Sequence, residues 1–294
     1  MNYSYPLYRP PSEANSLIFQ ITEGCSFNRC SFCSMYREKT FREKPLDEVL
    51  NDIRLIAPSY ANTRRVFLAD GDALYRSTDT LIEILEVLYD SFPLLERVTS
   101  YALPNNLITK TSDELLRLKN TGLTLLYYGL ETGSASLLKC ITKGATPTKM
   151  KTGLQKALNA GIQVSATVIL GLGGQHHWQE HIEQTAELVN ALNLTYLSTL
   201  QLTLGDDIRD EFLEKFNRHG KQYTPQSDLE LLREQTLLIS LIAPTQPLTF
   251  RSNHASNALA LKGILPNDRG ALLAQLEAAS HGETPLIPAW QRGL

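Results

Sequence analysis

Residues 17 to 33 read LIFQITEGCSFNRCSFC, a short apolar run followed closely by three cysteines. Residues 17–21 have the continuous apolar character of a buried strand. Cys25, Cys30 and Cys33 follow with the spacing C-x4-C-x2-C. The loops that follow the strands of an α/β barrel form its active face. The three thiols are therefore predicted to lie where chemistry takes place.

Beyond this loop, strand-like and helix-like patterns alternate along the chain. Alternation of this kind favours right-handed βαβ units and a mainly parallel sheet. Six such units predict an α/β fold, a partial (β/α)6 TIM-like barrel over about residues 15–205. The predicted strands are residues 17–21, 66–69, 97–101, 123–130, 162–170 and 194–202.

Beyond residue 205 the pattern becomes mainly helical. Helices are predicted at residues 207–216 and 228–241 and at about 270–279, with a short strand at 248–251. We expect this C-terminal extension, about residues 206–294, to cover one flank of the sheet, with residues 248–250 beside the sixth strand. The whole chain of 294 residues is predicted to be one domain.

Composition narrows the possible partners. The chain has 28 Lys and Arg against 31 Asp and Glu, a net charge of −3. This balance argues against a sequence-independent nucleic-acid binder, which needs a basic face, but a structured RNA is not excluded as a substrate. No apolar run reaches the roughly 18 residues of a membrane span, and residues 1–9 lack the order of a signal peptide. We expect no membrane partner and a cytoplasmic location.

The cysteine spacing favours one kind of metal centre. Three thiolates in one loop can hold three irons of a cubane [4Fe-4S] cluster, which leaves the fourth iron open to another ligand. A structural zinc site needs four protein ligands, and a ferredoxin normally supplies four cysteines. The remaining cysteine, Cys140, is over a hundred residues away. Zinc and three unliganded thiols remain as alternatives.

Three features together resemble the radical S-adenosylmethionine superfamily: Cys25, Cys30 and Cys33 after the first strand, Phe32 before the last cysteine, and six βα units. The resemblance covers about residues 17–204. Through its fourth-strand motif, residues 128–134 (YGLETGS), the chain is most similar to the branch of coproporphyrinogen dehydrogenases, Elongator and methylthiotransferases. The usual family spacing is C-x3-C-x2-C, so this loop has one extra residue.

The resemblance implies a cofactor and a reaction. The open iron would chelate the amino and carboxylate groups of S-adenosylmethionine. An electron from the cluster would cleave the cofactor to a 5′-deoxyadenosyl radical, which abstracts hydrogen from a substrate. The protein would supply positioning, electronic tuning and exclusion of water.

The resemblance also implies cofactor contacts after the second and fourth strands. Asp70, Gly71 and Asp72 would meet the ammonium of the cofactor, and the alternative is a βα turn with a helix cap. Glu131 would accept hydrogen bonds from the ammonium or the ribose hydroxyls, and the alternative is an acid at a helix N-terminus. Lys143 would pair with the cofactor carboxylate or be a solvated lysine.

The fifth and sixth strands complete the predicted cofactor site. Residues 168–174 resemble the family segment Gly-x-Ile-x-Gly, whose backbone packs against adenine, so Gly171 is a candidate contact. Thr199 and Leu200, at the end of the sixth strand, would close the other side.

Candidate substrate residues follow the short strand at 248–251. Arg251 and His254 would bind an acidic group or move a proton, and the alternative is a helix N-cap at Ser252 or Asn253. His176 and the two residues after it are predicted to form a rim or to begin a helix.

We therefore expect a radical S-adenosylmethionine enzyme that acts on a small organic substrate, with flavodoxin or ferredoxin as reductant. One alternative is radical modification of a tRNA or peptide. Another is an iron–sulfur protein that binds or carries electrons without catalysis. Cys140 is expected to be buried packing.

Overall fold

The computed structural model describes residues 1–293. Two compact units make up the chain. The first comprises Met1–Asn28, Met35–Tyr128 and Thr152–Val164, and the second comprises Arg29–Ser34, Gly129–Lys151 and the residues from Ser165 onward. The single domain expected from the sequence stays a prediction.

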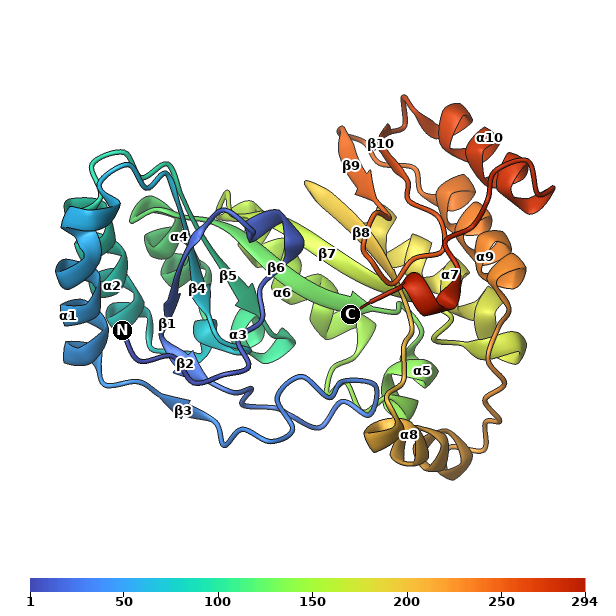
Figure 1. Cartoon of the computed structure of the whole chain (residues 1–294), viewed down its shortest axis with the longest axis horizontal. Coiled ribbons are helices and arrows are strands. Elements are labelled where there is room, and N and C mark those ends of the chain that lie inside the picture. Colours follow the sequence, from blue (N-terminus) through green and yellow to red (C-terminus); the bar gives the residue numbers. More distant parts are fainter. Residues whose placement is uncertain (294) are drawn as a thin grey trace. The chain divides into compact units, whose positions relative to one another are not determined.

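The molecule is an α/β protein with one large, mainly parallel sheet, as the sequence predicts (Figure 1). The strand order is β1-β4-β5-β6-β7-β8-β9-β10, so the six predicted strands follow one another in chain order. The pairs β1–β4, β4–β5, β5–β6, β7–β8 and β8–β9 are parallel, and β9–β10 is antiparallel. The strand bounds are β1 Leu17–Gln20, β4 Arg65–Ala69, β5 Arg97–Ala102, β6 Leu123–Glu131, β7 Gln163–Leu170, β8 Tyr196–Gln201, β9 Leu248–Arg251 and β10 Lys262–Leu265.

The first unit is built on β1, β4, β5 and most of β6. The central strand β4 is almost wholly buried, since Val66, Phe67 and Leu68 are at most 1% exposed. A capping box begins α4, where Thr111 and Glu114 bond to each other's backbone N–H groups. The helices are α1 Leu46–Ile56, α2 Thr78–Ser91, α3 Pro104–Thr109 and α4 Ser112–Asn120, with part of α6 Pro147–Asn159 and the 3₁₀ turns Pro11–Glu13, Ala57–Tyr60 and Ala73–Tyr75.

A small hairpin in the first unit frames the cysteine loop. Strand β2, Thr22–Glu23, pairs antiparallel with β3, Arg42–Glu43. Arg42 holds Glu23 with two hydrogen bonds, of 2.8 and 2.7 Å. The chain therefore leaves β2 for the cysteine loop and returns from it at β3.

The second unit carries the end of β6, most of β7, strands β8 to β10 and the C-terminal extension. Helix α9 packs against both α7 and α10 in this unit. Its capping box at Ser227 and Glu230 explains why the helix begins there. The helices are α5 Ala135–Cys140, α7 Gly174–Asn190, α8 Asp206–Arg218, α9 Asp228–Leu241 and α10 Arg269–Ser280, with a 3₁₀ turn at Ala289–Gln291.

The C-terminal extension confirms some expectations and corrects others. Strand β9 lies beside β8, as predicted. The prediction missed β10, because its sequence Lys-Gly-Ile-Leu has a charge and a glycine in four residues. The helix N-cap alternative at Ser252 or Asn253 is wrong, since the chain there is a loop between two strands. The helix start near His176 is confirmed, because α7 begins at Gly174.

Within residues 1–293, no helix combines the length and the apolar character that a membrane crossing requires.

Candidate functional site

The cysteine loop contributes to both units. Cys25 lies in the first unit, whereas Cys30 and Cys33 lie in the segment that belongs to the second. All three residues are half-buried, whereas Cys140 on α5 is fully buried, as expected for packing. Among the described residues, no group of three or more His, Cys, Asp or Glu is arranged to hold a single metal ion. A cubane does not require such an arrangement, because each of its irons takes its thiolate at a separate corner.

In the second unit, the cysteine loop is fastened to the segment that follows α5. The backbone N–H of Ser31 donates to the carbonyl oxygen of Ile141 over 3.0 Å. Lys215 on α8 donates to the carbonyl oxygen of Arg29 over 3.2 Å. Lys143 Nζ lies 5.9 Å from the centre of the Phe32 ring, a cation–π contact. The loop residues between the second and third cysteines are thus positioned by the chain around Lys143.

Lys143 and Glu131 form a buried ion pair in the same unit. Lys143 Nζ donates to Glu131 Oε1 over 2.7 Å, and the two side chains are 7% and 8% exposed. Burial acts against the charged form of Lys143, but Glu131 and then the thiols of Cys30 and Cys33 outweigh it and raise its pKa. The solvated-lysine alternative is therefore wrong. The helix-acid alternative for Glu131 is also wrong, since α5 begins four residues later, at Ala135.

Backbone strain gathers at the predicted cofactor segments. Within residues 1–293, three residues other than glycine have positive φ in the left-handed region: Asn28 at 41°, Glu131 at 63° and Thr142 at 53°. Asn28 lies between the first two cysteines, and Thr142 immediately precedes Lys143. Such residues cost about 1 to 3 kcal/mol each and tend to cluster at functional sites. The sequence carries no signal for this strain.

Helix α7 supports the turn that follows Glu131. His181 Nε2 lies 3.0 Å from the carbonyl oxygen of Ile169, which can only accept, so Nε2 carries the proton. Nδ1 then accepts from Thr132 Oγ1 over 2.8 Å. The Gly133 N–H donates to Thr185 Oγ1 over 2.8 Å. Burial lowers the pKa of His181 to about 4, so this support is neutral near pH 7.

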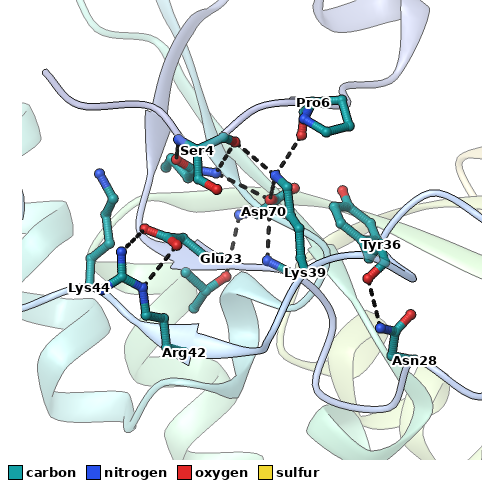
Figure 2. A network of polar contacts seen from close by, with 12 residues as sticks. Ser4, Pro6, Glu23, Asn28, Tyr36, Lys39, Arg42, Lys44 and Asp70 are labelled. Atoms are coloured by element: carbon teal, nitrogen blue, oxygen red, sulfur yellow. Dashed lines mark hydrogen bonds and ion pairs between the residues drawn. The ribbon is translucent and has the colours of Figure 1, made fainter.

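In the first unit, Asp70 is the centre of a polar network (Figure 2). Its Oδ2 accepts from Lys39 Nζ over 2.9 Å, from Gln20 Nε2 over 3.2 Å and from the Gly24 N–H over 3.3 Å. Lys39 also donates to the carbonyl oxygens of Ser4 and Pro6, over 2.7 and 2.5 Å. This network joins the end of β4 to residues near the N-terminus and to both ends of the cysteine loop.

Gly71 and Asp72 follow in the same turn. A Cβ on Gly71 would lie 2.5 Å from Cε2 of Tyr36, so glycine lets that ring pack here. Asp72 accepts a hydrogen bond from Ser26, the residue after Cys25. Burial raises the pKa of Asp72, against the opposing effects of Ser26 and Asn106. Asp72 precedes a 3₁₀ turn without capping it, so the helix-cap alternative is wrong for this residue.

The C-terminal extension holds the backbone of Gly171. The N–H of Gly171 donates to Glu234 Oε1 over 3.0 Å, and Tyr223 OH donates to its carbonyl oxygen over 3.1 Å. Burial raises the pKa of Glu234 to about 8, although its hydrogen bonds act in the other direction. Glu234 was not singled out in the sequence, because a glutamate in the middle of an amphipathic helix is ordinarily on its exposed side.

Thr199 lies on β8 with its side chain toward α9, where Gln235 donates to its Oγ1 over 3.2 Å. Any cofactor contact by Thr199 would use its backbone. Its carbonyl oxygen accepts from Asn257 Nδ2 over 2.8 Å, and the N–H of Gln201 donates to Asn257 Oδ1 over 2.8 Å. Asn257 thus ties the loop after β9 to the end of β8, a role that the polar sequence of this loop only hinted at.

Arg251 and His254 lie at the end of β9 and in the loop after it. The Arg251 guanidinium is stacked 4.4 Å from the centre of the Tyr196 ring. His254 Nδ1 accepts from the Ser256 N–H over 3.1 Å, so the proton of the neutral ring is on Nε2. Burial lowers the pKa of His254. The ring can thus offer a hydrogen-bond donor at Nε2.

The three cysteines suit an iron–sulfur cluster, and each unit has one buried charged group with unused hydrogen-bonding capacity. The cysteine loop supplies three thiols, the ligand type that iron–sulfur clusters take. Lys143 is buried, and within residues 1–293 it uses one of its three ammonium donors, on Glu131. Asp70 Oδ1 is buried without a hydrogen-bond partner among the described residues. In the second unit a carboxylate would satisfy Lys143, and in the first unit a cationic group would satisfy Asp70.

A mainly parallel α/β sheet with three half-buried cysteines in the loop that follows β1 and β2 defines the class, since such loops carry the active sites of α/β barrel enzymes. The sequence pattern of the radical SAM superfamily matches residues 19–189, more than half of the chain, and the chain belongs to that superfamily. Its members are enzymes that use a [4Fe-4S] cluster and S-adenosylmethionine.

Two curated relatives share part of the chain. A protein of Methanocaldococcus jannaschii with a provisional methylthiotransferase name is 25% identical over 186 residues, 58% of this chain and 39% of the relative. An uncharacterized methyltransferase of Pyrococcus horikoshii is 25% identical over 184 residues, 61% of this chain and 38% of the relative. The chain thus spans under two fifths of the length of these relatives. The first name agrees with the branch that the fourth-strand motif predicts.

Solved structures show the same fold. Methylornithine synthase superposes with a TM-score of 0.55 at 13% identity, over 89% of this chain and 68% of that one. The radical S-adenosylmethionine methyltransferase TsrM of Kitasatospora setae, solved with cobalamin and a [4Fe-4S] cluster, gives 0.58 at 13% identity, over 92% and 61%. These similarities confirm the predicted fold class.

Proposed function

We propose that this protein cleaves S-adenosylmethionine reductively and abstracts a hydrogen atom from a small organic substrate. One observation carries the proposal: in the second unit, Lys143 stacks on Phe32, between two of the cysteines, and its charge is stabilised by Glu131. When bound, the cluster supplies an electron, and S-adenosylmethionine supplies the hydrogen-abstracting group. The chain's own residues hold and orient these groups.

Each predicted residue has a role in this proposal. Cys25, Cys30 and Cys33 would hold three irons as thiolates. Lys143 would bind the carboxylate of the methionine moiety through its unused donors. Glu131 would accept from the ammonium or from ribose hydroxyls. Because both side chains are buried, these contacts would be stronger than the same contacts in water.

The remaining candidates would shape the site. Asp70 would offer its unpartnered oxygen to a ligand ammonium, and Asp72 would fasten the loop through Ser26. Gly71 would allow close approach, and Gly171 would present its backbone to adenine. Phe32 and Thr199 would contribute packing and a backbone edge. Arg251 and His254 would contact the substrate.

The test is anaerobic reconstitution with iron and sulfide, followed by an assay for 5′-deoxyadenosine. The wild type is compared with Cys30→Ala and with Cys140→Ala, which removes the buried fourth thiol. We expect about four irons per chain and product from the wild type and Cys140→Ala, and neither from Cys30→Ala. A Cys30→Ala protein that still forms 5′-deoxyadenosine contradicts the ligand set.

The proposal also includes an electron donor, whereas the cell compartment is a separate expectation from the sequence. Flavodoxin or ferredoxin would supply the electron, and the cytoplasmic location stays a prediction. A reconstituted cluster that exchanges electrons with either carrier but neither binds nor cleaves S-adenosylmethionine would favour an electron-transfer protein and overturn the proposal.

A further inference from the structure

Strands β8, β9 and β10 in the second unit have one face that is covered by helices. Leu197, Phe250 and Leu265 lie on this face and are fully buried. Gln235 of α9 bonds to Thr199 there, and a Cβ on Gly263 would lie 3.1 Å from Leu272 of α10. Figure 1 shows α9 and α10 on one side of these strands.

The opposite face of the same strands is partly exposed and mostly polar. Ser198 is in register with Arg251, which is in register with Lys262, so one row crosses three strands. Tyr196, Thr249 and Ile264 form the neighbouring row. We call these six residues the open face; all six are half-buried or exposed.

Two cations stand opposite each other on the open face. Arg251 and Lys262 are directly paired across antiparallel strands, where like charges are destabilising. Arg251 stacks on Tyr196, and neither cation has an acidic partner among residues 1–293. The two adjacent positive charges destabilise the hairpin and are not neutralised by the described chain. A bound anion would supply the missing negative charge.

We propose that the open face binds an oxyanion of the substrate, a carboxylate or a phosphate carried by a small molecule. This inference rests on the proposed function, because the substrate is that of the radical reaction. Arg251 would hold two oxygens with its planar guanidinium, and Lys262 would add a point charge. The Ser198 and Thr249 hydroxyls would bond to polar groups elsewhere on the molecule. Two cations are complementary to one or two negative charges, which favours a small anion over a polyanion.

The test measures binding of simple probes to the anaerobically reconstituted protein by calorimetry. Benzoate carries a carboxylate, phenyl phosphate carries a phosphate, and benzyl alcohol is the neutral control. We expect saturable binding of at least one anion, and no binding of the alcohol. Arg251→Gln and Lys262→Gln should each raise the Kd about fivefold and together about twentyfold, since each removes one charge-assisted contact.

Arg233→Gln is the matched control. Its guanidinium lies 4.7 Å from the centre of the Trp178 ring in the same unit, so the variant loses a similar cation–π contact away from the open face. We expect its Kd to equal that of the wild type. Thermal unfolding of every variant confirms that it is folded, and Lys262 is exposed enough for its replacement to be tolerated.

Several outcomes overturn the inference. They are equal affinity of the wild type and the double variant, equal binding of benzyl alcohol and the anions, or a tRNA affinity that both substitutions reduce while the small anions do not bind. The assay for 5′-deoxyadenosine on the wild type tests the proposed function independently of anion binding. Product without anion binding refutes the open-face site alone, and anion binding without product refutes the proposed function alone.

Discussion

Two buried lysine–carboxylate pairs, one in each unit, differ in how fully their hydrogen-bonding groups are used. Lys39 lies 2.9 Å from Asp70, and Lys143 lies 2.7 Å from Glu131. Lys39 donates three hydrogen bonds, to Asp70 and to the carbonyl oxygens of Ser4 and Pro6. Lys143 has one hydrogen bond within residues 1–293. The lysine of the first pair is saturated and joins segments of the chain, whereas the lysine of the second pair has donors left for a ligand.

The difference teaches that burial alone does not separate a structural lysine from a ligand-binding one. Both lysines are 7% exposed. The count of unused donors separates them, because a buried donor without a partner costs free energy that a ligand can recover. Glu131 also has a positive φ, whereas neither Lys39 nor Asp70 does. Because such strain tends to occur at functional sites, it supports a binding role for the Lys143–Glu131 pair.

The largest effect is expected at the Lys39–Asp70 pair, whose lysine is saturated. Lys39→Met leaves Asp70 buried without its cation, which should lower the free energy of unfolding by about 3 to 5 kcal/mol. Urea unfolding at pH 7 measures the loss. The double variant Lys39→Met/Asp70→Leu should recover part of it, because no charge is left buried. A loss below about 1 kcal/mol for the single variant would refute the structural role.

The next largest effect should be a loss of catalysis when the Lys143–Glu131 pair is changed. Lys143→Met should reduce the rate of 5′-deoxyadenosine formation per cluster about 100-fold, the loss of a buried charge-assisted contact to a ligand. Its free energy of unfolding should fall less than that of Lys39→Met, since the substitution also removes two unsatisfied donors. Unchanged cleavage together with severe destabilisation would make the two pairs equivalent.

A substitution at Gly129 should disturb the Lys143–Glu131 pair less strongly, because it removes neither charge. A Cβ there would lie 2.0 Å from Glu131 Oε1 and 2.9 Å from Lys143 Nζ. Gly129→Ala should therefore displace the pair and raise the Kd for S-adenosylmethionine about tenfold. Gly270→Ala, whose Cβ has nothing within 4 Å, is the control. Equal affinities of the two variants would break the link between this pair and the cofactor.

Glu234 is a buried carboxyl group for which no lysine partner is found among residues 1–293, so its protonation can be compared with that of the two lysine–carboxylate pairs. Burial raises its pKa to about 8 in the folded state, against about 4.3 in the unfolded chain. Between these values the folded state holds a proton that the unfolded state has lost. The free energy of unfolding should then fall as pH rises to about 8, by about 1 kcal/mol per pH unit.

The pH effect is read as the difference between the wild type and Glu234→Gln, which stays neutral. Urea unfolding from pH 6.5 to 8 avoids most of the contribution of His181, whose pKa is lowered to about 4. Parallel stability curves for the two proteins would show that Glu234 is ionised in the folded state.

Much of the fold could be predicted, because its strands are long or strongly apolar. Strand β6 and helix α9 carry clear patterns, and the structure places both close to the predicted positions. Strand β10 could not be found, since its stability depends on pairing with β9 rather than on its own residues.

The site was predicted as a set of residue types, without its geometry. Three cysteines in one loop are recognisable from their spacing alone. Whether Lys143 has unused donors depends instead on which acceptors the fold places near it. Glu234 and Asn257 act on residues 63 and 58 positions away, at Gly171 and Thr199. No local pattern encodes contacts of that range.

The most direct measurement is equilibrium dialysis of S-adenosylmethionine against the reconstituted wild type, Lys143→Met and Lys39→Met under anaerobic conditions. If Lys143 holds the cofactor carboxylate, its variant should raise the Kd about 100-fold, whereas the folded Lys39→Met protein, in which Asp70 keeps its unpartnered oxygen, should raise it about tenfold at most. Wild-type affinity in Lys143→Met would contradict the account.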